Sequence, residues 1–148
     1  ALLGLAGGLA RLLRAPREEE KAYLPVARPV DAVQEAALLT LRCLECNPAL
    51  PAFLGADPEG QEAGVGLFEA LLALADASSR SEGRAGLLRC LTLSLLHLSA
   101  ERGLAQRLSA ADLSPGARAA LGMPGSHRYS AGDALCHVAL RVAVAGAR

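Results

Sequence analysis

The sequence predicts an all-α protein built from closely packed helices. Leucine recurs at helical spacing through most of the 148 residues, and no segment alternates apolar and polar residues as a strand would. Hydrophobic residues make up 52% of the chain and aromatic residues only 3%, so the core must consist of small and aliphatic side chains. Capped helices are expected to begin near residues 31, 81 and 130, a spacing of about fifty residues. We therefore expect one segment over residues 1–148, an irregular armadillo- or HEAT-like α-solenoid of about six helices, with a closed helical bundle as the alternative.

The chain opens with a leucine-rich helical pattern over residues 2–13. Arg11 and Arg14 fall toward its end, where positive charge favours the helix dipole. Pro16 is expected to end this helix, because proline lacks the backbone N–H that a helix interior needs. A polar, proline-containing connector is then expected over residues 15–30.

A capped helix is expected next. Asp31 can accept hydrogen bonds from the first turn, and Gln34 holds the capping-box position three residues later. The apolar pattern continues to about Cys46, and Asn47-Pro48 ends it. The segment PALPAFLGA indicates one short helical turn, and the glycine- and acid-rich residues 55–66 are expected to form a solvated connector.

Four further helices are expected in the second half of the chain. A nearly all-apolar helix is expected over residues 67–77, the longest helix over about 82–99, and a short one as far as Leu108. An irregular connector with two prolines and three glycines is expected over residues 109–130. Ser130, with Asp133 three residues on, is expected to cap the last helix.

Charge and hydropathy argue against several classes of partner. Fifteen basic and fifteen acidic residues cancel, and no basic stripe could neutralise phosphates, so no nucleic-acid partner is expected. The longest apolar run, residues 87–98, is too short to span a membrane. Arg11 and Arg14 beside the first helix are a weak signal for a lipid-binding surface, so its apolar side is expected to dock on a neighbouring helix, with a membrane-surface module as the alternative. The chain opens with alanine and lacks a signal-peptide pattern, so we expect an internal segment of a longer protein.

Cys43 and Cys46 form the one motif with metal-ligand spacing. Residues three apart share a helix face, so both sulfurs could reach one metal. A closed zinc site needs two more ligands, and Cys90, Cys136 and the histidines form no second pair with zinc-finger spacing. A redox pair is expected at a helix start, where the dipole lowers the thiol pKa, whereas this pair lies at the far end. We therefore expect the four cysteines to be reduced and Cys43 and Cys46 to be buried structural residues, with a small helical metal-binding or thiol protein that uses this pair as the alternative.

The other polar residues are interpreted as structural. Cys136 and His137 are adjacent, so a helix points them about 100 degrees apart, too far for a nucleophile and its base. His97 is expected to be a core histidine bonded to the backbone, and His127 lies in a loop where either a structural or a functional role is open. No nucleophile elbow or phosphate-binding glycine loop occurs. No catalytic, cofactor or metal residue is therefore assigned, and neither enzymatic activity nor a small-molecule substrate is expected.

The stretch LLHLSAERGLAQRL, residues 95–108, is expected to form a corner between two helices. Glu101 and Arg102 are expected to fix its turn by capping or by pairing with a neighbouring helix. The aliphatic residues expected to bury the corner are Leu95, Leu98, Leu104 and Leu108.

Four segments, taken in order, resemble a known family. They are LARLLRAPREEEKAYLP, QEAALLTLRCLECNPALPAFL, LLHLSAERGLAQRLS and GSHRYSAGDALCHVALRVA. The most telling elements are Leu98-Ser99-x-Glu101-Arg102 with Arg107-Leu108 close behind, and the Gly125-Ser126-His127 entry to an apolar helix. In this order the segments resemble the middle of the high-temperature-induced dauer-formation protein family and, more distantly, the dymeclin family, in register from about Leu5 to Ala145.

The resemblance implies a large cytosolic helical-repeat protein that associates peripherally with Golgi and trans-Golgi membranes. It implies support of secretory trafficking, including sorting into dense-core vesicles, with trafficking proteins as partners and no enzymatic activity. Members attach to the membrane partly through a myristoylated N-terminal glycine, and this chain contains no such motif. Golgi association is therefore expected to depend on parts of the protein outside this chain.

Overall fold

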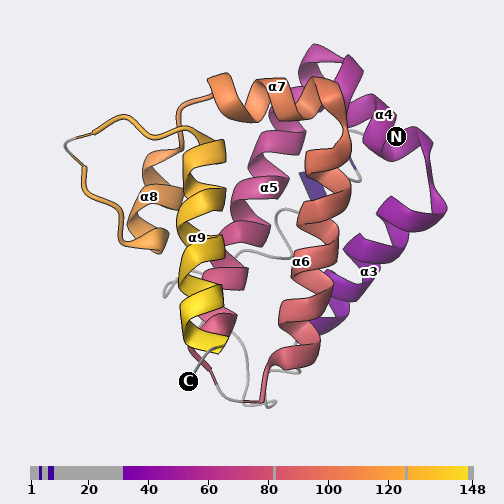
Figure 1. Ribbon diagram of the computed structural model, residues 1–148. Helices are drawn as coiled ribbons and strands as arrows, with labels where there is room; N and C mark the ends of the chain where they lie inside the picture. Colours follow the sequence, from indigo (N-terminus) through magenta and orange to yellow (C-terminus); the bar gives the residue numbers. More distant parts are fainter. Residues whose placement is uncertain (1–3, 5–6, 9–31, 82, 126, 147–148) are drawn as a thin grey trace, which may run out of the picture.

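The structure is a computed structural model that describes residues 4, 7–8, 32–81, 83–125 and 127–146. The expected first helix, the connector over residues 15–30 and the Asp31 cap lie outside the described residues, except for Gly4, Gly7 and Gly8, whose backbone is helical. The described residues contain seven helices and no strand, so the all-α prediction is confirmed (Figure 1). The helices are α3 Ala32–Cys46, α4 Ala49–Ala56, α5 Pro58–Ser79, α6 Ala85–Ala100, α7 Arg102–Ala110, α8 Pro115–Leu121 and α9 Ala131–Gly146.

Helix α5 lies at the centre of the described helices. It contacts α4, α6, α7, α8 and α9, while α3 packs mainly against α6. In Figure 1, α6 and α9 run on either side of α5, and α7 crosses one end. One hydrophobic cluster, mostly of leucine and alanine, joins all seven described helices. In a solenoid each layer contacts only its neighbours, whereas α5 and α9 meet across a long stretch of sequence. The expected solenoid layering is therefore not confirmed within the described part.

The predicted connector over residues 55–66 is wrong, because α4 and α5 occupy nearly all of it. Asp57 caps α5 by accepting the N–H groups of Glu59 and Gly60, and Pro58 stands at the first helical position. Both are strong helix-start signals. The glycines that suggested a loop are packing residues, since a Cβ on Gly60 would clash with the Phe53 carbonyl and one on Gly64 would lie 2.9 Å from Leu104 Cδ1. The helix expected over residues 67–77 therefore begins at Pro58, and α5 is the longest described helix.

The predicted connector over residues 109–130 is only partly irregular. Helix α7 extends to Ala110, and α8 occupies Pro115–Leu121. Ser114 caps α8 by accepting the N–H of Ala117, and Gly122 ends it in the left-handed conformation with φ 65°. Proline and glycine here mark the start and end of a short helix rather than a continuous loop.

Two predicted helix boundaries are confirmed and one is shifted. Helix α3 ends at Cys46, directly before Asn47 and Pro48. Ser130 and Asp133 form the expected capping box ahead of α9, because each side chain bonds to the backbone N–H of the other. Helix α6 begins at Ala85, later than expected, because Gly83 adopts φ 81° in the preceding turn.

Candidate functional site

The cysteines expected to be structural do not share one environment. Cys43 is half-buried against the core, whereas Cys46 and Cys136 are exposed, so the predicted burial is wrong for Cys46. All four cysteines are free, and Cys43 and Cys46 stand at the end of α3 as expected. Among the described residues, no group of three or more His, Cys, Asp and Glu side chains is placed to hold a metal ion.

The three histidines also lie apart from one another. His97 is half-buried on α6 and makes no hydrogen bond within the described part of the chain, so the expected backbone partner is not found. His127 is exposed, with its ring edge-on to Tyr129 at a centroid distance of 6.2 Å. His137 is exposed on α9, and its Nε2 lies 3.4 Å from Arg141 Nη1.

The corner between α6 and α7 is confirmed. Its four leucines, Leu95, Leu98, Leu104 and Leu108, are all buried. The turn is made by the extended backbone of Glu101, whose carbonyl accepts the N–H of Ala105 at 2.8 Å. The Glu101 side chain makes no capping bond and packs against Gly55, and neither Glu101 nor Arg102 forms an ion pair with a described residue. The expected role of these two side chains is therefore wrong, because the corner is fixed by backbone geometry and leucine packing.

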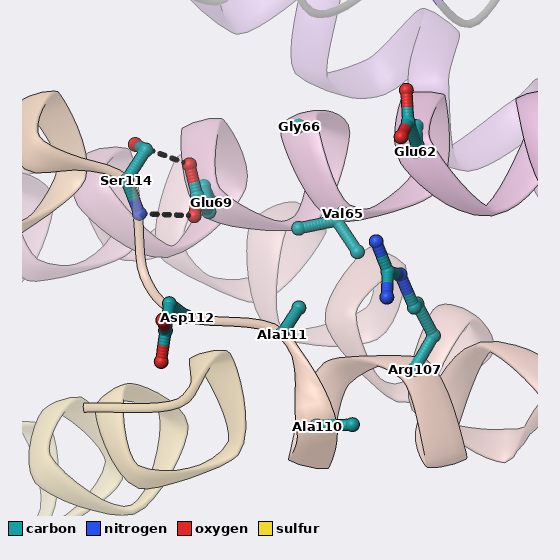
Figure 2. A pocket seen from close by; sticks show the side chains of 9 residues that line it. All are labelled: Glu62, Val65, Gly66, Glu69, Arg107, Ala110, Ala111, Asp112 and Ser114. Atoms are coloured by element: carbon teal, nitrogen blue, oxygen red, sulfur yellow. Dashed lines mark hydrogen bonds between the residues drawn. The ribbon is translucent and has the colours of Figure 1, made fainter. Parts of the chain in front are cut away.

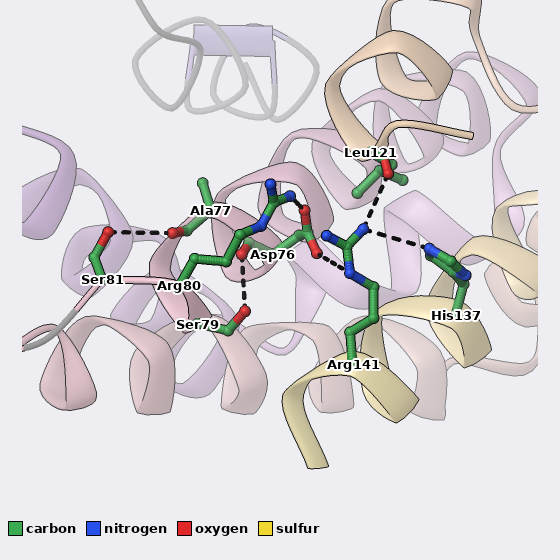
Figure 3. A network of polar contacts seen from close by, with 8 residues as sticks. All are labelled: Asp76, Ala77, Ser79, Arg80, Ser81, Leu121, His137 and Arg141. Atoms are coloured by element: carbon green, nitrogen blue, oxygen red, sulfur yellow. Dashed lines mark hydrogen bonds and ion pairs between the residues drawn. The ribbon is translucent and has the colours of Figure 1, made fainter. Parts of the chain in front are cut away.

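A buried carboxylate joins α5 to α9, and sequence reasoning missed it. Asp76 is fully buried and forms ion pairs with Arg80, one turn later on α5, and with Arg141 on α9, whose Nε lies 3.3 Å from Oδ1 (Figure 3). Arg141 also donates to the Leu121 carbonyl at the end of α8, at 3.1 Å. Neither Asp76 oxygen receives a well-directed hydrogen bond from a described residue, so its charge is balanced by the two guanidinium groups. This arrangement holds three helices together.

A second buried carboxylate, Glu69 on α5, has a different partner. The residue is only 8% exposed, and its Oε1 and Oε2 accept the backbone N–H and the hydroxyl of Ser114 at 2.8 and 2.6 Å. Because Ser114 Oγ accepts the N–H of Ala117, its own hydrogen is free to point at Glu69. No basic nitrogen of the described residues forms an ion pair with Glu69. Glu69 is thus a nearly buried acid that has hydrogen bonds but no counter-ion in the described part of the chain.

Glu69 stands at one end of a shallow pocket of about 390 Å³ between α5 and the α7–α8 connection. Figure 2 shows Glu69 and Ser114 at one end, and Arg107 and Glu62 toward the other. Between these ends lie the small apolar groups of Val65, Gly66, Ala110 and Ala111. Asp112 is at the edge and pairs with Arg128 outside the pocket at 2.8 Å. A pocket with apolar walls and charged ends suits a long side chain that carries a charge at its tip.

Large aliphatic side chains are exposed on the outer helices. Leu140 is 67% exposed and Leu96 is 62% exposed, on α9 and α6 respectively. Leu38 and Leu39 on α3 and Val144 on α9 are also exposed. None of the described helices has both the length and the apolar character needed to cross a bilayer.

Comparisons of the chain with protein-family models, with curated proteins and with solved structures find no match.

Proposed function

We propose that this chain is a non-enzymatic helical scaffold that supports secretory trafficking and dense-core vesicle sorting. In this proposal it acts on the cytoplasmic face of Golgi and trans-Golgi membranes, as part of a longer helical-repeat protein. The membrane anchor is supplied by parts outside this chain, and the surfaces of the helices bind trafficking proteins.

The observation that carries the scaffold proposal is the exposure of aliphatic side chains on helices α3 and α9. Leu38 and Leu39 on α3 and Leu140 and Val144 on α9 point outward from the core. Leu140 and Val144 are one helical turn apart on α9, so they form a joined apolar patch, and contiguous exposed apolar patches mark sites where another protein segment packs. Further helical layers or partner proteins could cover these faces, as they do in helical-repeat proteins.

The placement at the Golgi is supported by the order of the four sequence segments, which resembles the high-temperature-induced dauer-formation protein family. The corner over residues 95–108 is one of those segments, and its Glu101 and Arg102 lie where α6 ends and α7 begins. The buried acids Asp76 and Glu69 are likewise engaged in contacts between helices. These roles suit a protein that presents surfaces to partners.

Proximity labelling in a secretory animal cell line tests this proposal. The full chain is fused to a biotin ligase and compared with a Leu140→Glu, Val144→Glu variant and with the ligase alone. We expect the wild-type fusion to enrich proteins of Golgi and vesicle membranes, and the variant to lose part of that set. A labelled set equal to that of the ligase alone would refute the proposal.

A further inference from the structure

We propose that the pocket between α5 and the α7–α8 connection receives one basic side chain from a partner polypeptide. Glu69 binds the cationic tip, and the apolar middle of the pocket covers the aliphatic stem. This inference rests on the scaffold function proposed above and gives the scaffold a specific point of recognition.

The first argument is the charge of Glu69. A buried carboxylate is normally paired with a cation, because hydrogen bonds alone offset only part of its lost hydration. Asp76 follows this rule with two arginines, whereas Glu69 has Ser114 as its only side-chain partner among the described residues. Both Glu69 oxygens accept hydrogen bonds from Ser114, and each oxygen retains a further lone pair for a cation. The pocket opens beside this group.

The second argument is Gly66, a glycine in the middle of α5. Glycine inside a helix is less favourable than alanine by about 0.5–1 kcal/mol. Gly60 and Gly64 on the same helix are explained by close contacts with Phe53 and Leu104, whereas a Cβ on Gly66 would meet nothing within 4 Å. No packing contact within the described residues therefore explains why position 66 is a glycine. Its effect is to deepen the pocket where the stem of a ligand side chain would lie.

The third argument is the balance of charge around the pocket. Asp112 is already paired with Arg128, which leaves two acids, Glu62 and Glu69, and one cation, Arg107, among the residues that line the pocket. The lining therefore has one negative charge in excess, which matches one lysine or arginine side chain. Arg107 at the far end disfavours a second cation. The pocket is open on one side, so it suits a side chain carried by a surface that covers the pocket better than a free small molecule.

The test is a nuclear magnetic resonance titration of the full chain with a blocked peptide, acetyl-Gly-Ala-Lys-Ala-Gly-amide. Matched probes are the same peptide with norleucine in place of lysine, and the free polyamine spermidine. We expect the lysine peptide to produce saturable shifts at the amide groups of Gly66, Ala111 and Ser114, and the norleucine peptide to produce none. Equal shifts from the two peptides would overturn the proposal. Spermidine binding as tight as that of the lysine peptide would overturn the choice of a polypeptide partner.

Two variants locate the binding. Glu69→Gln keeps the shape and an acceptor for Ser114 but removes the charge, so the lysine peptide should bind about tenfold more weakly. Glu59→Gln removes an exposed acid elsewhere on α5 and should leave binding unchanged. Gly66→Leu places a side chain in open space, so it should abolish binding while the melting temperature stays equal or rises. Unchanged binding in folded Gly66→Leu would refute the pocket even if Glu69→Gln failed to fold.

The two proposals can fail separately. Golgi labelling without binding of the lysine peptide would support the scaffold proposal and refute the proposed binding pocket. Binding of the lysine peptide without Golgi labelling would support the proposed binding pocket and refute the trafficking role.

Discussion

The carboxylate of Asp76 illustrates how a single residue can hold distant parts of this chain. Burying a charge is costly unless it is paired, and Asp76 is paired from both α5 and α9. Both arginines are partly exposed, so they can reach water when the carboxylate is lost. Loss of the carboxylate therefore removes two ion pairs without leaving a fully buried cation unpaired.

We expect Asp76→Asn to lower the free energy of unfolding by about 1–3 kcal/mol, because both guanidinium groups lose their buried partner. Chemical denaturation measures this change. The control is Glu45→Gln, which removes an exposed ion pair with Arg42 and should change stability by less than about 0.5 kcal/mol. Equal denaturation midpoints for Asp76→Asn and wild type would contradict the assigned role.

Asp133 gives a pH-dependent contribution at the start of α9. The backbone N–H of Ser130 is the main cause that lowers the pKa of Asp133 below its ordinary value of 3.8, and the Ser130 hydroxyl adds to it. Since the folded pKa lies below the unfolded one, this stabilising contribution is fully present above about 3.8 and is lost as pH falls through the lowered value.

We expect Ser130→Ala to move the pKa of Asp133 part of the way back toward 3.8, because the backbone N–H remains and only the hydroxyl is removed. Carbon-detected magnetic resonance of the carboxyl group over an acid titration measures the pKa. Ser99→Ala, which removes a hydroxyl from α6, is the control and should leave Asp133 unchanged. An Asp133 pKa that stays the same in Ser130→Ala would show that the hydroxyl does not contribute.

At the scale of elements, the crossing of α4 and α7 depends on two glycines in contact. The Cα of Gly103 lies so close to the Gly55 carbonyl that a Cβ would overlap its oxygen. Any side chain at position 103 would therefore push the backbones of α4 and α7 apart.

We expect Gly103→Ala to destabilise the protein by about 1–3 kcal/mol, because α4 and α7 must move apart. Gly66→Ala, in open space on α5, should instead stabilise it by about 0.5–1 kcal/mol through helix propensity. Thermal unfolding of both variants provides the comparison. Similar melting temperatures for the two would be inconsistent with the close crossing.

The corner between α6 and α7 gives a second expectation for an element. Leu98 is fully buried there, so Leu98→Ala should cost about 2–5 kcal/mol by leaving a cavity in the core. Leu96, two residues earlier and 62% exposed, is the matched control, and Leu96→Ala should cost less than about 1 kcal/mol. Denaturant titration measures the free energy of unfolding of both variants. Equal decreases would contradict the assignment of Leu98 to the buried corner.

At the scale of the whole molecule, the helices share one core. Leucine and alanine from α3 through α9 belong to a single hydrophobic cluster centred on α5. A chain with one core is expected to unfold as one unit, whereas stacked repeats can lose layers one at a time.

We therefore expect one cooperative unfolding transition. Far-ultraviolet circular dichroism and the methyl resonances of α3 and α9 should report the same midpoint, because both helices pack on the shared cluster. Earlier loss of the α3 signals would indicate a separate layer and would favour the solenoid arrangement.

Local signals in the sequence were sufficient to predict several elements. Asn47-Pro48 marks the end of α3, Ser130 with Asp133 marks the start of α9, and the leucines around residue 98 mark a buried corner. The start of α5 carries an equally local signal in Asp57-Pro58, but the glycines that follow it favour a loop. Those glycines look like loop residues until the helices they touch are known.

The sequence by itself determined the helical class and the aliphatic core, because both depend on residue type and on spacing within one segment. Only the tertiary structure decided that α5 is central, that Asp76 meets Arg141, and that Glu69 is held by Ser114 beside a pocket. Each of these contacts joins residues far apart in the chain. Helical periodicity shows which face of a helix is apolar, but it does not show which other helix will cover that face.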